Sequence, residues 1–223
     1  ADRTLPPYER YQRHRPQIRA TLLRELVNKV GYEKHHVLRE LLQNAESAYA
    51  SQRERPSERR FEFSVAETGL AGRRQVTARH AGRTFNESDN EGRCRHDVER
   101  VWRLAAESER TPEEIGRFNR GFKTLFTVAS DGVVRISSGP FDFEVIDLLL
   151  LRPPEPKPTV APPRPDTAFV FEVTLTDALA MLRWDRSPSA GEPLPPLNAS
   201  SLVFLRHLSH VVIHFEKRSW SWA

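Results

Sequence analysis

Three polar residues recur at helical spacing in one stretch of the chain, H-V-L-R-E-L-L-Q-N-A-E-S-A (36–48). Glu40, Asn44 and Ser47 would form a row on one helix face. The row borders an apolar stripe, so a helix packed on a core would hold it at the lip of a cleft. The stripe consists of Val37, Leu38, Leu41, Ala45 and Ala48. A carboxylate one turn from an amide oxygen can orient a water while the amide ligates Mg²⁺. For an isolated E-x-x-x-N pair, an amphipathic helix with a solvated border is the simpler explanation.

A glycine-bearing stretch, I-G-R-F-N-R-G-F-K-T-L-F (115–126), is the second candidate for chemistry. Glycine permits close backbone approach, so successive N–H groups can face phosphate oxygens. A helix over 121–128 would aim its N-terminal N–H groups at the same phosphates, and Lys123 would add a point charge. Two alternatives remain. The P-loop pattern differs by one inserted residue, Phe122, and requires a strand where 111–115 is typical of a capped helix start. A plain turn between two helices also explains the glycines.

The third stretch, R-H-A-G-R-T-F (79–85), follows a segment with the alternation of a strand. Taken alone, His80, Ala81 and Gly82 indicate a turn that ends this strand.

In chain order, these stretches resemble the three motifs of the GHKL ATPases, the superfamily of gyrase B, Hsp90, histidine kinases and MutL. E-L-L-Q-N-A-E-S-A is similar to the first motif of the sacsin-type and bacterial "ATP-binding protein" branch, E-L-x-Q-N-A-x-D-A. R-H-A-G-R-T-F resembles the second motif, H-D-G-R-P-F followed by an acidic residue, which Asp89 would supply. I-G-R-F-N-R-G-F-K-T resembles the Gly-rich lid, I-G-R-F-G-x-G-F-K-S. The resemblance covers about residues 20–215.

The resemblance implies that the chain binds ATP and Mg²⁺. It implies Glu40 as the general base and Asn44 as the magnesium ligand. The nucleotide-binding residues that it implies are Asn44, Ser47, Ala81, Gly82, Phe85, Gly116, Arg117, Phe118, Asn119, Arg120, Gly121, Phe122, Lys123 and Thr124.

Three departures from the family pattern concern the expected nucleotide site. Ser47 replaces an aspartate, and Asn119 replaces a glycine, which is a mild change because asparagine tolerates the left-handed conformation. Ala81 stands where the family has the aspartate that accepts a hydrogen bond from the adenine amino group. Alanine cannot accept it. Adenine is then read by backbone and water, or nucleotide binding is weakened or lost, or the position has been altered.

The fold that the resemblance implies is an α/β (α+β) two-layer sandwich, the Bergerat fold. It has a mixed, largely antiparallel sheet, helices on one face and a flexible ATP lid. Apolar periodicity predicts helices over 17–30, 33–50, 97–106, 121–128, 177–184 (capped by Asp177) and 201–208. It predicts strands over 61–65, 75–80, 133–137, 141–146, 167–175 and 211–215, of which 167–175 is expected to be central.

We expect a basic N-terminal arm (1–16), then an ATP-binding domain (17–216). The lid would span about 86–124, and a proline-rich loop would occupy 152–165 inside the fold. Residues 217–223 would form a C-terminal tail, leading to further domains of a longer protein.

Composition suits one substantial globular domain: 223 residues, 38% hydrophobic and 29% charged. The single cysteine excludes an internal disulfide, and no apolar run approaches the roughly 18 residues of a membrane span. We therefore expect an intracellular, cytoplasmic protein without a membrane partner. The net charge is +4, and the first thirty residues alone supply it (seven Lys/Arg minus three Asp/Glu). Such an arm supports nucleic-acid binding only weakly.

The leading functional hypothesis is a Mg-dependent ATPase domain that converts ATP to ADP and phosphate and acts as a clamp-like or chaperone-like conformational switch. Many relatives dimerise on ATP binding, so a nucleotide-dependent homodimer and further domains or subunits are the implied partners. Sacsin-like chaperone work, antiviral defence and DNA transactions all use such modules. The alternative is a non-hydrolysing nucleotide sensor or protein-interaction module.

Overall fold

The computed structural model describes residues 7–30, 33–52, 57–85, 87–88, 92, 97–102, 121–147, 150–152, 166–183, 196–197 and 202–223. The chain divides into two compact units, Ala1–Glu33 and Lys34–Ala223. None of the helices in the described part is long and apolar enough to cross a membrane.

The first unit contains one helix, α1 (Pro7–Val30), which begins well before the predicted start at Gln17. Proline at the first helical position costs nothing, because its missing N–H has no partner within the helix anyway. Pro16 lies inside the helix and removes one backbone hydrogen bond, but the Glu, Arg and Gln residues around it are good helix formers. Much of the predicted arm is therefore helical, while residues 1–6 lie outside the described part.

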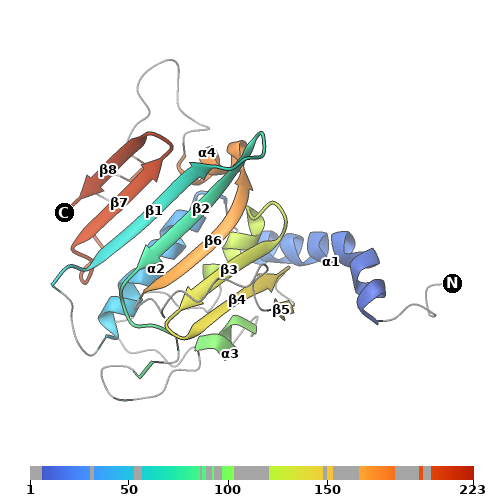
Figure 1. Cartoon of the computed structure of the whole chain (residues 1–223), viewed down its shortest axis with the longest axis horizontal. Coiled ribbons are helices and arrows are strands. Elements are labelled where there is room, and N and C mark those ends of the chain that lie inside the picture. Colours follow the sequence, from blue (N-terminus) through green and yellow to red (C-terminus); the bar gives the residue numbers. More distant parts are fainter. Residues whose placement is uncertain are drawn as a thin grey trace. The chain divides into compact units, whose positions relative to one another are not determined.

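The second unit is built on an eight-stranded sheet with the order β5-β4-β3-β6-β2-β1-β7-β8 (Figure 1). The strands are β1 (Arg60–Glu67), β2 (Arg73–His80), β3 (Val133–Ser138), β4 (Phe141–Ile146), β5 (Leu150–Arg152), β6 (Thr167–Thr174), β7 (His210–Phe215) and β8 (Arg218–Trp222). The pair β1–β7 is parallel, and every other neighbouring pair in this order is antiparallel. The prediction of a central strand is confirmed, since β6 lies between β3 and β2.

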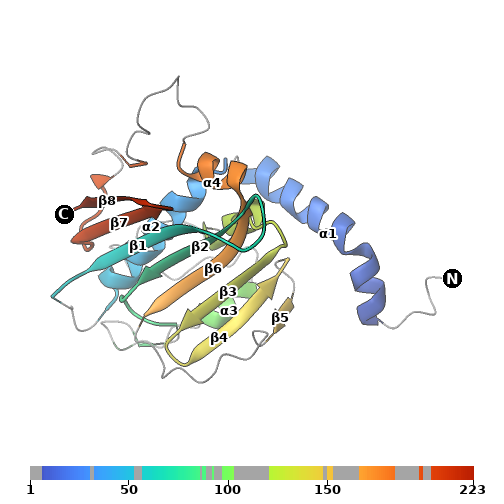
Figure 2. The same ribbon diagram turned by 45° about the horizontal axis from the view of Figure 1, so that its top comes forward.

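Alternate residues of these strands are buried under one layer of helices, α2 (His36–Ala50), α4 (Leu175–Met181) and the 3₁₀ helix Gly121–Thr127 (Figure 2). In β1, for example, Phe61, Phe63 and Val65 are buried and their neighbours are not, as the period of two requires. A short helix, α3 (Asp97–Trp102), follows β2 in the chain. The predicted fold class, a two-layer sandwich with a mixed, largely antiparallel sheet, is confirmed.

Several predicted boundaries were wrong. The helix predicted over 121–128 is a 3₁₀ helix and ends at Thr127. Helix α4 begins after Thr174, whereas the predicted helix began at Asp177. The Thr174 hydroxyl accepts a hydrogen bond from the Asp177 N–H (3.1 Å) and donates to its carboxylate (2.9 Å), so Thr174 is the N-cap of α4. Strands β5 and β8 were not predicted, and β8 occupies most of the expected C-terminal tail.

The helix predicted over 201–208 does not continue beyond Leu202 in the described residues 203–208, and Glu46 provides the physical reason. The Glu46 carboxylate is 1% exposed and accepts the backbone N–H groups of Arg206 (2.6 Å), His207 (2.8 Å) and Leu208 (2.9 Å). These three amides therefore donate to a side chain of α2 instead of to backbone carbonyls of a helix of their own. The segment before β7 is a turn, bonded from Leu205 N–H to Leu202 O at 2.9 Å.

We predict that Glu46→Ala lowers the free energy of unfolding by about 3 kcal/mol, because three backbone N–H groups lose a buried, charged acceptor. Glu46→Gln should cost less, since one acceptor oxygen remains. Urea unfolding measures both, and hydrogen exchange of the 206–208 amides should accelerate in Glu46→Ala. The exposed Glu58 provides the control: Glu58→Ala should change stability by less than about 0.5 kcal/mol. Equal stability of the two alanine variants would contradict the assigned role of Glu46.

Candidate functional site

Helix α2 presents the predicted polar row at the border of its buried face. Glu40, Asn44 and Ser47 are all half-buried, as expected for side chains at the edge of a packed helix. The predicted stripe is confirmed except at Ala48, which is half-buried. The buried residues of α2 are Val37, Leu38, Leu41, Leu42, Ala45, Glu46, Tyr49 and Ala50.

The turn after β2 packs directly on the C-terminal part of α2. A Cβ atom added to Gly82 would lie 2.9 Å from the Cβ of Ala48, 3.0 Å from its carbonyl carbon and 3.0 Å from the Tyr49 nitrogen. The next residue, Arg83, donates its N–H to the Ala48 carbonyl at 3.2 Å. Glycine is therefore required here by close backbone approach, and the first two sequence motifs are in contact.

Ala81 is held at this junction by its backbone. Its N–H donates to the Tyr49 hydroxyl at 3.0 Å, and the same hydroxyl accepts from the Arg60 N–H (3.1 Å) and donates to the Arg60 carbonyl (3.0 Å). Burial raises the pKa of Tyr49, so the hydroxyl keeps its proton. The Ala81 side chain is exposed. The position is thus fixed in space but offers no side-chain acceptor.

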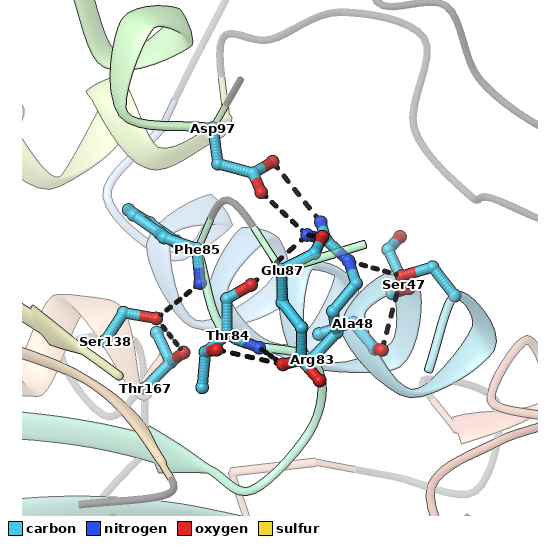
Figure 3. A network of polar contacts seen from close by, with 10 residues as sticks. Ser47, Ala48, Arg83, Thr84, Phe85, Glu87, Asp97, Ser138 and Thr167 are labelled. Atoms are coloured by element: carbon cyan, nitrogen blue, oxygen red, sulfur yellow. Dashed lines mark hydrogen bonds and ion pairs between the residues drawn. The ribbon is translucent and has the colours of Figure 1, made fainter. Parts of the chain in front are cut away.

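Arg83 joins α2 to α3 through a saturated polar network (Figure 3). Its guanidinium pairs with both carboxylate oxygens of Asp97, at 2.7 and 3.3 Å, and donates to the Ser51 hydroxyl at 3.0 Å. Ser51 in turn donates to the Ser47 carbonyl at 2.9 Å. The Arg83 side chain is only 10% exposed. Arg83 matched the second motif in the sequence, yet nothing in its spacing indicated that it anchors the start of α3.

A second network secures the residues after Arg83 to the sheet (Figure 3). The Phe85 N–H donates to the Ser138 hydroxyl at 2.8 Å, and Ser138 shares a 2.6 Å hydrogen bond with the Thr167 hydroxyl. Both hydroxyls are buried, and Thr167 pairs with His80 across β6 and β2. Sequence reasoning missed Ser138 and Thr167, because a hydroxyl at a strand end carries no motif. Asp89, the acidic residue of the second motif, lies outside the described residues.

The 3₁₀ helix Gly121–Thr127 packs against α2 and β3, and brings the end of the third motif to the first. Lys123 is 1% exposed and Thr124 is buried as well, and both residues have interaction partners. The other residues predicted to bind nucleotide in the Gly-rich lid, 116–120, lie outside the described residues. For Gly121 and Phe122 the structure describes only the backbone.

The donor set of the described residues limits how a metal ion could be held. In these parts of the chain, three or more His, Cys, Asp or Glu side chains are nowhere grouped so as to hold a metal ion. A magnesium ion at the polar row would depend on the Asn44 amide oxygen, phosphate oxygens and water. Such sparse protein coordination suits Mg²⁺ bound together with a nucleotide.

His80 ends β2 immediately before Ala81 and is fully enclosed. Burial lowers its pKa to about 4, with Arg83 acting in the same direction and Asp166 opposing it. The neutral ring accepts the Gly82 N–H on Nδ1 at 3.3 Å. Protonation of Nδ1 would remove this acceptor beneath the Gly82 turn.

We predict that Gly82→Ala destabilises the fold by about 1–3 kcal/mol, because the added methyl overlaps the α2 backbone rather than a flexible side chain. Gly69 is the matched control, since a Cβ there meets nothing within 4 Å. Gly69→Ala should shift stability by less than about 1 kcal/mol. Denaturant unfolding measures both variants, and similar values would show that the turn does not press on α2.

We also predict that stability falls as pH is lowered from about 6.5 to 4. The unfolded chain takes up a proton on His80 near pH 6.5, while the folded chain resists protonation until about pH 4. Unfolding is therefore favoured by about 3 kcal/mol at the lower end of this window. His80→Asn, which keeps an acceptor, should flatten the dependence measured by urea unfolding. The exposed His210 is the control, and His210→Asn should leave the slope unchanged.

A search against protein families found no match, and neither did a search of curated proteins. Among solved structures, the chain is similar to the ATPase region of Saccharomyces cerevisiae topoisomerase II bound to ICRF-187 (dexrazoxane), with a TM-score of 0.43 and 14% identity over 83% of this chain and 48% of that one. A second structure of the ATPase region of Saccharomyces cerevisiae topoisomerase II gives a TM-score of 0.45 and 14% identity, over 82% and 47% of the two chains. The chain spans about half the length of these two solved chains.

Proposed function

We propose that the second unit is an ATP-binding module that requires Mg²⁺ and hydrolyses ATP as a conformational switch. The observation that carries the proposal is the convergence of two distant stretches on α2, which itself contains the first motif. The Gly82 turn packs so closely on the helix that a Cβ added at Gly82 would lie 3.0 Å from its backbone. The 3₁₀ helix with Lys123 and Thr124 packs against the same helix. Glu40 and Asn44 form the half-buried border of that helix.

Each residue has a role that its chemistry permits. The Asn44 amide oxygen would ligate Mg²⁺, which shields phosphate charge when bound. Glu40, one turn away, would orient the attacking water and accept its proton. Lys123 and Thr124 would supply positive charge and a hydroxyl to the phosphates. Positioning and charge neutralisation would then carry most of the rate enhancement.

The wider biological assignments extend this proposal. Lid closure over bound nucleotide would make the module a clamp-like or chaperone-like switch, with a nucleotide-dependent homodimer and further domains or subunits as partners. Of the GHKL branches, the Q-N-A and F-K-T residues favour the sacsin-type one, and antiviral defence is one use of such modules. A cytoplasmic location fits this reading.

A second candidate, a nucleotide-binding or interaction module without hydrolysis, is favoured by one observation. Ala81 lies at the junction of the first two motifs, fixed by Tyr49, and has no side-chain acceptor for adenine. Retention of both Glu40 and Asn44 at the helix border favours hydrolysis, because a carboxylate at a partly desolvated site is costly to keep without use.

Calorimetric titration of the chain with a non-hydrolysable ATP analogue, with and without Mg²⁺, tests nucleotide binding. We expect Mg-dependent binding that Asn44→Ala weakens at least tenfold, because the proposed protein ligand of the ion is removed. Ala81→Asp should strengthen binding by restoring the adenine acceptor. A chain that binds no nucleotide as wild type, and still binds none as Ala81→Asp, would contradict the proposed site.

Phosphate release then separates the two candidates. Glu40→Gln keeps the size and polarity of the side chain but cannot accept the proton of water, so turnover should fall by roughly a hundredfold while analogue binding stays near wild type. A wild-type protein that binds ATP and releases no phosphate supports the non-hydrolysing module instead.

A further inference from the structure

The two edges of the sheet are built differently. At one edge, β5 has only three residues, Leu150–Arg152, which is one of the ways in which natural sheets avoid pairing with other chains. At the other edge, β8 runs over five residues, Arg218–Trp222. After Arg218 it carries neither charge nor proline, and in the described part of the chain no strand pairs with its outer side.

The pairing of β7 fixes which backbone groups of β8 face outward. The Glu216 N–H donates to the Val65 carbonyl on the β1 side at 2.9 Å, so the even-numbered residues of β7 point to β1 and the odd-numbered ones to β8. Ile213 pairs with Trp220, so Trp220 exchanges hydrogen bonds with β7. By alternation, Ser219 and Ser221 direct their N–H and C=O groups away from β7.

We propose that β8 pairs antiparallel with β8 of a second copy of this chain, about a twofold axis at Trp220. In this register each Ser219 faces the partner's Ser221, and both residues carry outward backbone groups. The two symmetric pairs exchange four backbone hydrogen bonds, the largest number that this edge offers. The contact is isologous, so it closes as a dimer rather than growing into a filament.

The side chains of β8 are self-complementary in the same register. Arg218, Trp220 and Trp222 alternate along one face, the face that also carries the buried Ile213 and Val211. Antiparallel pairing places exposed Arg218 opposite the half-buried Trp222 of the other copy, twice, which suits cation–π contact. The two Trp220 side chains meet at the axis as a close, non-hydrogen-bonded pair. A foreign strand would lack this reciprocal match.

The contact is small, so we expect a dimer that dissociates in the micromolar range and forms without nucleotide. This inference does not depend on the proposed ATP site. Dimerisation without nucleotide tests this inference, and nucleotide binding tests the proposed ATP site. A negative result in one experiment therefore leaves the other proposal unaffected.

Sedimentation velocity on the full chain without nucleotide tests the proposal. Wild type should show a concentration-dependent dimer. The double variant Ser219→Pro/Ser221→Pro removes two outward N–H groups from each copy without touching the bonds to β7, so the dissociation constant should rise at least tenfold. Ser219→Ala/Ser221→Ala keeps both N–H groups and should dimerise as wild type. If the wild type stays monomeric at all protein concentrations, or if the proline variant dimerises as the wild type does, the proposal is overturned.

Cross-linking tests the register, and provides an answer even if the proline variant unfolds. In a Cys94→Ser background, Trp220→Cys places two thiols opposite each other at the axis, about 4.5 Å apart at Cα, within disulfide range. Oxidised glutathione should link this variant into a dimer. Trp222→Cys is the matched control, since its partner in this register is Arg218 and not a second cysteine. Equal cross-linking of both variants, or linking of Trp222→Cys alone, would exclude the proposed pairing.

Discussion

The packing of α2 on the sheet is the constraint on which the other features of the candidate site depend. Its buried face fixes the rotation of the helix, and that rotation leaves Glu40 and Asn44 half-buried at the border. The same helix then serves as the surface on which the Gly82 turn and the 3₁₀ helix pack. The apolar face of α2 thus determines where its polar chemistry can occur.

Hydrogen bonds of two charged side chains add to the apolar packing that positions α2. Glu46 lies on the same helix, two residues beyond Asn44, and its buried carboxylate binds the chain before β7. At the C-terminal end of α2, Arg83 and Asp97 link the helix to α3. A buried charge is stable only when its hydrogen bonds are satisfied, so these links leave little freedom in how α2 meets its neighbours. The polar row is presented by a helix whose C-terminal half is held by both links.

Position 81 is defined by its backbone rather than by its side chain. The Ala81 N–H donates to the Tyr49 hydroxyl, while the alanine side chain offers no hydrogen-bond acceptor. His80 stays neutral beneath the turn because burial lowers its pKa to about 4. An aspartate introduced at position 81 would therefore start from a defined backbone position.

Local pattern alone determined the amphipathic helix at 36–50 and the strand β6, because periodicity of 3.6 or 2 directly records which face is buried. The two-layer fold class was implied by the resemblance of three motifs to the GHKL ATPases. Tertiary contacts decided the rest. The apolar pattern of 201–208 suggested a helix, yet the Glu46 carboxylate, some 160 residues earlier, takes its amides. The tail after Lys217 became β8 because β7 offered an unpaired edge, and Arg83 became an anchor because Asp97 lies opposite it. These outcomes depend on partners distant in sequence, which local propensity cannot encode.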